Sequence, residues 1–184
     1  MAGERPPAET PREAVKLNRR VFLASLPFFL KALAAPRGLR IGVDACPYCF
    51  MTVLDARHAA QAVNPQGKAF FYDDPACLLD QLNGWGGPSL TAKEVYLADY
   101  AGSTRTAPRW VAAEKALLYH NPKVRTPMGS GLLAFASREA LERHLKERPE
   151  RAGGRVLTWA EALKEGEKRT WVPADFFPPP PKAP

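Results

Sequence analysis

Apolar and polar positions follow the same succession twice along this chain of 184 residues. Each succession holds an apolar-rich segment, an Asn-Pro turn, a short apolar run, a helical pattern and a further strand-like run. The pattern therefore predicts an α+β fold, with two similar ββαβ halves in one compact domain. The first succession covers 50–63, 64–65, 69–72, 75–82 and 94–99, and the second covers 109–120, 121–122, 132–135, 138–148 and 155–158.

Polar residues mark where the predicted helices begin. Asp73 or Asp74 precedes the first helix and Ser137 precedes the second, and such side chains accept hydrogen bonds from a first helical turn. A last helix over 159–165 is expected to close the fold. The two repeats are placed at about 40–104 and 105–165, within a domain of residues 35–172.

The two ends of the chain differ from this domain. Residues 1–34 contain Arg19-Arg20, then an apolar stretch, then Ala32-Leu33-Ala34, which resembles a twin-arginine signal peptide with a small-residue cleavage site. The alternative is an amphipathic helix packed on the domain. Residues 173–184 are rich in proline and predict a disordered tail.

This leader predicts export to the periplasm or to the outer face of the cytoplasmic membrane. A leader that stays uncleaved would act as a membrane tether. The formal net charge is +7, and the +4 that remains after residue 34 is spread along the chain without a basic stripe, which argues against nucleic acid as a partner. A nucleophile paired with a base is not evident either, nor is a phosphate-binding loop, so we expect a protein that is not an enzyme.

The candidate chemistry lies in Cys46-Pro-Tyr-Cys49-Phe-Met51. Proline at the second place favours a tight turn that brings the two sulfurs together. If the chain is extended from Cys49 to Met51, their side chains share one face and present a thiolate beside a thioether. These soft donors select copper(I) over hard cations. The alternative is a buried free cysteine beside a core methionine.

Other candidate ligands lie elsewhere in the chain. Met128 stands in a Gly/Pro-rich loop before an apolar run, where a core role is less common than inside a helix. Cys46 and His120 are weaker candidates, and His58 could also supply a nitrogen. Cys77 fits an apolar helix face, so we expect it to be a structural buried thiol.

Several segments together resemble the NosL family, the copper(I)-binding accessory proteins of nitrous oxide reductase maturation. They are 44–51, 70–78, 98–100, 109–111 and 126–135, in the family's order and spacing. The resemblance implies two ββαβ halves with copper(I) held between them by Cys49, Met51 and Met128, and delivery to a client copper enzyme or its assembly machinery. Two features depart from the family: Phe50 replaces the usual glycine, and the chain lacks the acylated cysteine of its lipoprotein members.

Cys-Pro-Tyr-Cys is also the sequence of a glutaredoxin active site, so a thiol–disulfide oxidoreductase using Cys46 and Cys49 is the alternative function. That chemistry needs a helix that begins at the motif and lowers the pKa of the attacking thiol. The run after Cys49 instead favours a strand.

Overall fold

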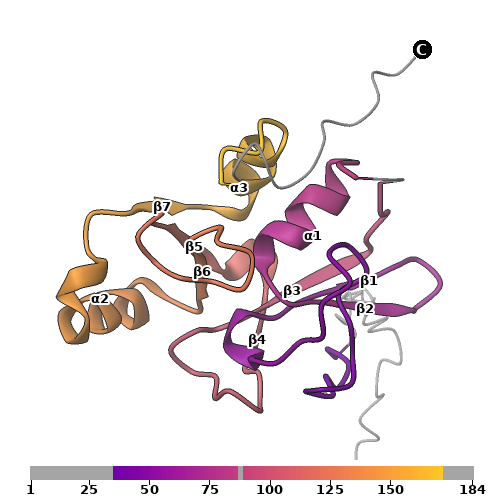
Figure 1. Ribbon diagram of the computed structural model, residues 1–184, viewed down its shortest axis with the longest axis horizontal. Coiled ribbons are helices and arrows are strands. Elements are labelled where there is room, and N and C mark those ends of the chain that lie inside the picture. The colour runs from indigo at the N-terminus through magenta and orange to yellow at the C-terminus, as the bar shows by residue number, and fades with distance from the viewer. Residues whose placement is uncertain (1–34, 87–88, 172–184) are drawn as a thin grey trace, which may run out of the picture. The chain divides into compact units, whose positions relative to one another are not determined.

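The computed structural model describes residues 35–86 and 89–171, and its regular elements form two antiparallel sheets (Figure 1). The predicted leader and the Pro-rich tail lie outside the described residues. The first sheet has the order β2-β1-β3-β4 and the second has the order β6-β5-β7. The strands are β1 (Ala60–Val63), β2 (Ala69–Tyr72), β3 (Glu94–Ala98), β4 (Trp110–Ala112), β5 (Leu117–His120), β6 (Leu132–Phe135) and β7 (Arg155–Leu157).

The two sheets repeat one topology, which confirms the predicted pair of similar halves. In each, a central strand pairs with the next strand of its hairpin on one side and with the strand after the helix on the other. Ala60 lies opposite Tyr72 in the first hairpin, and Leu117 lies opposite Phe135 in the second. The first sheet has one strand more, because β4 pairs with β3.

In the described part of the chain, three helices accompany the sheets: α1 (Pro75–Leu82), α2 (Arg138–Glu147) and α3 (Trp159–Gly166). Each begins after a side chain that accepts a backbone N–H of its first turn, and these side chains belong to Asp74, Ser137 and Thr158. The described residues also contain three short 3-10 turns: η1 (Ala56–His58), η2 (Ala113–Lys115) and η3 (Pro149–Arg151).

The second sheet buries both of its faces, because successive side chains of a strand point to opposite sides. Leu118, Leu132 and Ala134 belong to the main core, which also includes residues of the first sheet and of α1. Tyr119 and Leu133 instead pack with residues of α2 in a separate core. The two halves are thus joined through one apolar interior.

Helix α1 lies at the junction of the halves (Figure 1). It packs against β1 of the first sheet, β6 of the second sheet, and α3. Its residues 75–80 are all buried, so side chains in its first turn are shielded from solvent. Within 35–86 and 89–171, we find no helix with both the length and the apolar character needed to span a membrane.

The segment after Cys49 differs from the predicted strand. It forms one isolated antiparallel bridge between Ala45 and Thr52, and the chain between them makes a tight loop. Phe50 has a φ of 64°, in the left-handed region, so the backbone turns at this residue. Cys49 and Met51 therefore do not form the extended pair that the sequence suggested.

Candidate metal centre

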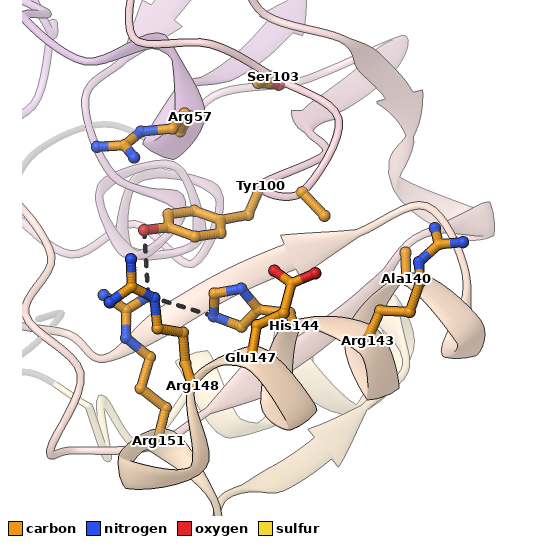
Figure 2. Close-up of a pocket in the computed structure, with 10 residues that line it drawn as sticks. Arg57, Tyr100, Ser103, Ala140, Arg143, His144, Glu147, Arg148 and Arg151 are labelled. Atoms are coloured by element: carbon orange, nitrogen blue, oxygen red, sulfur yellow. Dashed lines mark hydrogen bonds between the residues drawn. The ribbon is translucent and has the colours of Figure 1, made fainter.

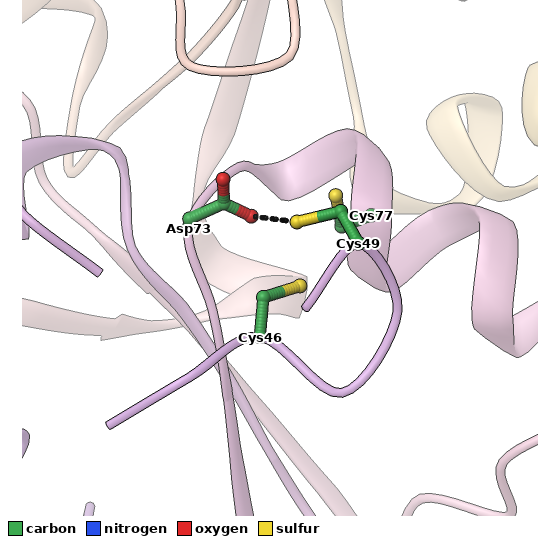
Figure 3. A group of neighbouring side chains, drawn as sticks. All are labelled: Cys46, Cys49, Asp73 and Cys77. Carbon is green, nitrogen blue, oxygen red and sulfur yellow. Dashed lines mark hydrogen bonds between the residues drawn. The ribbon is translucent and has the colours of Figure 1, made fainter. Parts of the chain in front are cut away.

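Three thiols and one carboxylate converge beside the first turn of α1. The sulfur atoms of Cys46, Cys49 and Cys77 and a carboxylate oxygen of Asp73 all lie within 4.8 Å of one another. Figure 3 shows these side chains pointing toward a common centre. Cys46, Cys77 and Asp73 are buried, whereas Cys49 is half-buried. The group is therefore closed on most sides and open at Cys49.

Backbone hydrogen bonds shape the loop that carries Cys46 and Cys49. The N–H of Cys46 donates to the carbonyl of Met51 at 2.8 Å, and the N–H of Phe50 donates to the carbonyl of Cys46 at 2.9 Å. The Tyr48 hydroxyl donates to the Asp80 carboxylate on α1 at 2.9 Å. These contacts fix the loop against the helix that provides Cys77.

Asp80 also connects the cysteine loop to the C-terminal part of the described chain. Its carboxylate forms a buried ion pair with Arg169, with the closest atoms 3.0 Å apart. Gly86 packs against the ring of Tyr48, where an added Cβ would lie 3.1 Å from the ring. The cysteine loop is thus held from both sides.

The other two members of the group come from one short stretch of chain. Asp73 directly follows β2, and Cys77 lies in the first turn of α1. Asp74 begins the helix and positions Cys77, because its side chain accepts the N–H of Ala76 and its carbonyl accepts the N–H of Cys77. The turn from strand to helix therefore places Asp73 and Cys77 on the same side as the cysteine loop.

Hydrogen bonds among the three sulfurs favour ionisation of one thiol, Cys46, over the other two. The thiols of Cys49 and Cys77 lower the pKa of Cys46, because both hydrogen-bond to its sulfur. The same interaction raises the pKa of Cys49 to about 12 and that of Cys77 far above the ordinary range. One thiolate thus forms readily, whereas ionisation of the other two thiols needs a compensating cation.

Only one of the two carboxylate oxygens of Asp73 has a hydrogen-bond partner in the protein. One of its oxygens accepts the Cys49 thiol at 3.2 Å, while the other is buried without a hydrogen-bond partner. Burial, followed by the charge of Cys46, raises its pKa to about 7. A buried unpaired oxygen beside three sulfurs fits a centre built to receive a positively charged ion.

Both predicted methionines lie next to this group, on different segments. Met51 is 42% exposed and lines a hollow of about 490 Å³ together with Asp73 and Pro127. Met128 is buried in the same core as Cys46 and Cys77. Its loop comes from the second half, so the centre lies where the two halves meet.

Asp74 fastens the Met128 loop to the start of α1. Its carboxylate accepts the N–H of Met128 at 3.1 Å and the hydroxyl of Ser130 at 2.8 Å. Gly131 has a φ of 67°, and a Cβ there would clash with the carbonyl of Asn121. Glycine at this position therefore lets the loop return to β6.

His120 lies apart from the group of four. It stands at the end of β5, and its ring makes an edge contact with Trp171, with centroids 6.3 Å apart.

Asp73 and Cys77 were not predicted as ligands. Their spacing of four residues across the start of a helix is the one local sign that both could face one point.

A thiol–disulfide oxidoreductase would need Cys49 or Cys46 at the beginning of a helix. Here a left-handed residue and an isolated bridge follow Cys49, and the next regular element is η1. The described segment 50–55 therefore lacks the helix that lowers the thiol pKa in that class of enzyme.

These observations define a small α+β protein of two similar halves, with a thiol-rich centre able to hold a metal ion at their junction. The sequence matches the model of the NosL family over residues 42–165, and the chain belongs to that family. The fold is similar to that in the crystal structure of the copper chaperone NosL from Shewanella denitrificans, with a TM-score of 0.56 and 17% sequence identity. The match covers 68% of this chain and 94% of that one. None of the curated proteins matches the sequence.

Proposed function

We propose that the protein binds copper(I) outside the cytoplasm and carries it to a client metalloenzyme, nitrous oxide reductase or its assembly machinery. The observation that carries the proposal is the convergence of three sulfurs at the junction of the halves. Thiolates and thioethers are soft donors, which favour copper(I) over hard cations. Copper is then cargo rather than a resident cofactor, which agrees with a protein that is not an enzyme.

We extend the ligand set that the sequence suggested, with support from the convergence of the three thiols. Cys49 remains the central ligand, because its half-buried sulfur lies at the open side of the group. Cys46 and Cys77 add two buried sulfurs. Met51 at the rim and Met128 from the second half supply thioethers that could complete the coordination as the ion enters or leaves.

A carrier must also meet its partners, and the surface around the centre suits brief docking. In the described part of the chain, the exposed large hydrophobic side chains are Val43, Phe50, Met51 and Leu54. They lie on the segment that bears Cys46 and Cys49. Apolar side chains gathered around a half-open metal centre favour contact with a partner that receives the ion.

Competition with a copper(I) chelator tests the binding proposal. The full chain, reduced and free of oxygen, is titrated as wild type and as Cys49→Ser and Cys77→Ser. The control is Ala76→Ser, which places a hydroxyl at an equally buried neighbouring position of α1. We expect copper(I) affinity to fall in both cysteine variants and to stay near wild type in the control. Unchanged affinity in Cys49→Ser would refute the proposal.

The client is tested separately in cells that make nitrous oxide reductase. Without this protein, the copper content of the reductase should fall, and wild type but not Cys49→Ser should restore it. A reductase with full copper content in cells lacking the protein would rule out this client and leave copper binding intact.

A further inference from the structure

A second pocket, of about 440 Å³, lies between η1, the loop after β3, and α2 with η3. None of the residues that line it belongs to the metal centre. Its lining side chains are mostly polar, and four of them are arginines: Arg57, Arg143, Arg148 and Arg151. Figure 2 shows Arg57, Arg148 and Arg151 on the side of the Tyr100 hydroxyl, and Arg143 on the other side of the pocket, beside Ala140.

Two guanidinium groups are fixed against the ring of Tyr100. Arg57 lies 5.4 Å and Arg151 lies 5.7 Å from the ring centroid, and Figure 2 shows them on opposite sides of the ring. Arg57 is held by a paired contact with Asp55, at 2.6 and 2.9 Å. Both guanidiniums are therefore oriented before any ligand arrives.

Arg151 is also held by its hydrogen bonds. One of its nitrogens lies 3.2 Å from the Tyr100 hydroxyl and 3.2 Å from Nε2 of His144. A guanidinium only donates, so Nε2 of His144 accepts and the ring is neutral, with its proton on Nδ1. The remaining N–H groups of Arg151 are left to bind another acceptor.

The positive charge of this pocket is not balanced by its own lining. Glu147 is the acidic residue among the side chains that line it. Arg143 and Arg148 form no ion pair with any carboxylate in the described part of the chain. Like charges gathered in a hollow repel one another, and a bound anion would relieve that repulsion.

We propose that this pocket binds a phosphate group, held by Arg151 and Arg148 with the Tyr100 hydroxyl, while Arg57, paired with Asp55, packs on the other side of the Tyr100 ring. Two guanidiniums and a hydroxyl match an anion that has several oxygens and more than one negative charge. Phosphate chemistry has two sources here, free phosphate and the headgroup of an anionic phospholipid. Phosphate binding here is independent of copper binding, because the pocket and the metal centre share no residue.

The test compares substitutions at the two ends of α2. Arg148→Gln removes an exposed guanidinium from the pocket, and Arg138→Gln removes an exposed guanidinium of α2 that does not line it. Calorimetric titration of the full chain with inorganic phosphate measures one source. Sedimentation with phosphatidylglycerol vesicles, against phosphatidylcholine vesicles, measures the other.

We expect Arg148→Gln to weaken phosphate or vesicle binding about tenfold, as loss of one charge-assisted hydrogen bond does, while Arg138→Gln stays near wild type. Binding of phosphate alone identifies the free anion, and binding of phosphatidylglycerol vesicles alone identifies the lipid headgroup. The absence of binding to either probe overturns the proposal. Equal weakening by both substitutions also overturns it, because it would show only a general effect of charge. Copper(I) affinity should be the same in all three proteins.

Discussion

At position 50 a phenylalanine occupies a left-handed turn, with its side chain 82% exposed. The left-handed region costs a residue with a Cβ about 1–2 kcal/mol, whereas glycine enters it freely. The resemblance to the NosL family implies glycine at this place, and the backbone of this chain gives a physical reason for such a preference. Phe50 keeps the turn but strains it.

Phe50→Gly should therefore stabilise the metal-free protein by about 1 kcal/mol, since little apolar burial is lost and the strain is removed. Urea unfolding measures the change. Val43→Gly, at another exposed position of the same segment without a positive φ, should instead lower the free energy of unfolding. A Phe50→Gly variant less stable than wild type would show that the turn is not strained.

Met128 can be both a core residue and a ligand, and one substitution separates the two roles. Met128→Leu keeps the volume, so the free energy of unfolding should fall by less than about 1.5 kcal/mol. Loss of the thioether should weaken copper(I) binding about tenfold, which corresponds to about 1.4 kcal/mol. Chelator competition measures the affinity. Unchanged affinity would assign Met128 to the core alone and leave the sulfur ligands in the first half.

At the scale of elements, Asp74 does more than begin α1. It also accepts hydrogen bonds from Met128 and Ser130, which join the second half to the metal centre. Asp74→Ala should cost about 3 kcal/mol, about 1 for the helix cap and the rest for buried donors left without an acceptor. Ser137→Ala, which removes the cap of α2 and an exposed hydrogen bond to Glu139 but no contact between the halves, should cost about 1 kcal/mol. Urea unfolding of both variants provides the comparison, and equal losses would contradict the joining role of Asp74.

The sequence was sufficient to predict most elements, because their signals are local. The apolar runs and the Asn-Pro turns located the hairpins. Asp73 or Asp74, and Ser137, were expected before the first two helices, and the structure has Asp74 and Ser137 there. The prediction of a strand after Cys49 was wrong, since the positive φ of Phe50 is not visible in a pattern of strand-forming residues.

Cys77 was predicted to be a structural thiol because the sequence shows only its place on an apolar helix face. Its burial was foreseen, but its approach to Cys46 and Cys49 depends on contacts between distant segments.

For the whole molecule, the predicted leader would decide whether the protein is exported. Arg19 and Arg20 lie outside the described residues, so their role stays a prediction from sequence. Replacing both by lysine should retain the protein in the cytoplasm, because the twin-arginine translocon reads the paired arginines. Fractionation of cells that express each form measures the effect, with Lys31→Arg as a control for basic residues in the leader. Undiminished export of the double variant would exclude this route.

The two halves repeat one topology, yet their equivalent positions carry different side chains. Asp73 and Cys77 flank the start of α1, whereas Ala136 and Ala140 flank the start of α2. The second half thus has the same scaffold with alanine at both positions, and its proposed contribution to the centre of the first half is Met128. The fold is therefore duplicated, but the group of metal-binding side chains is not. The expected stoichiometry is one copper ion for each chain.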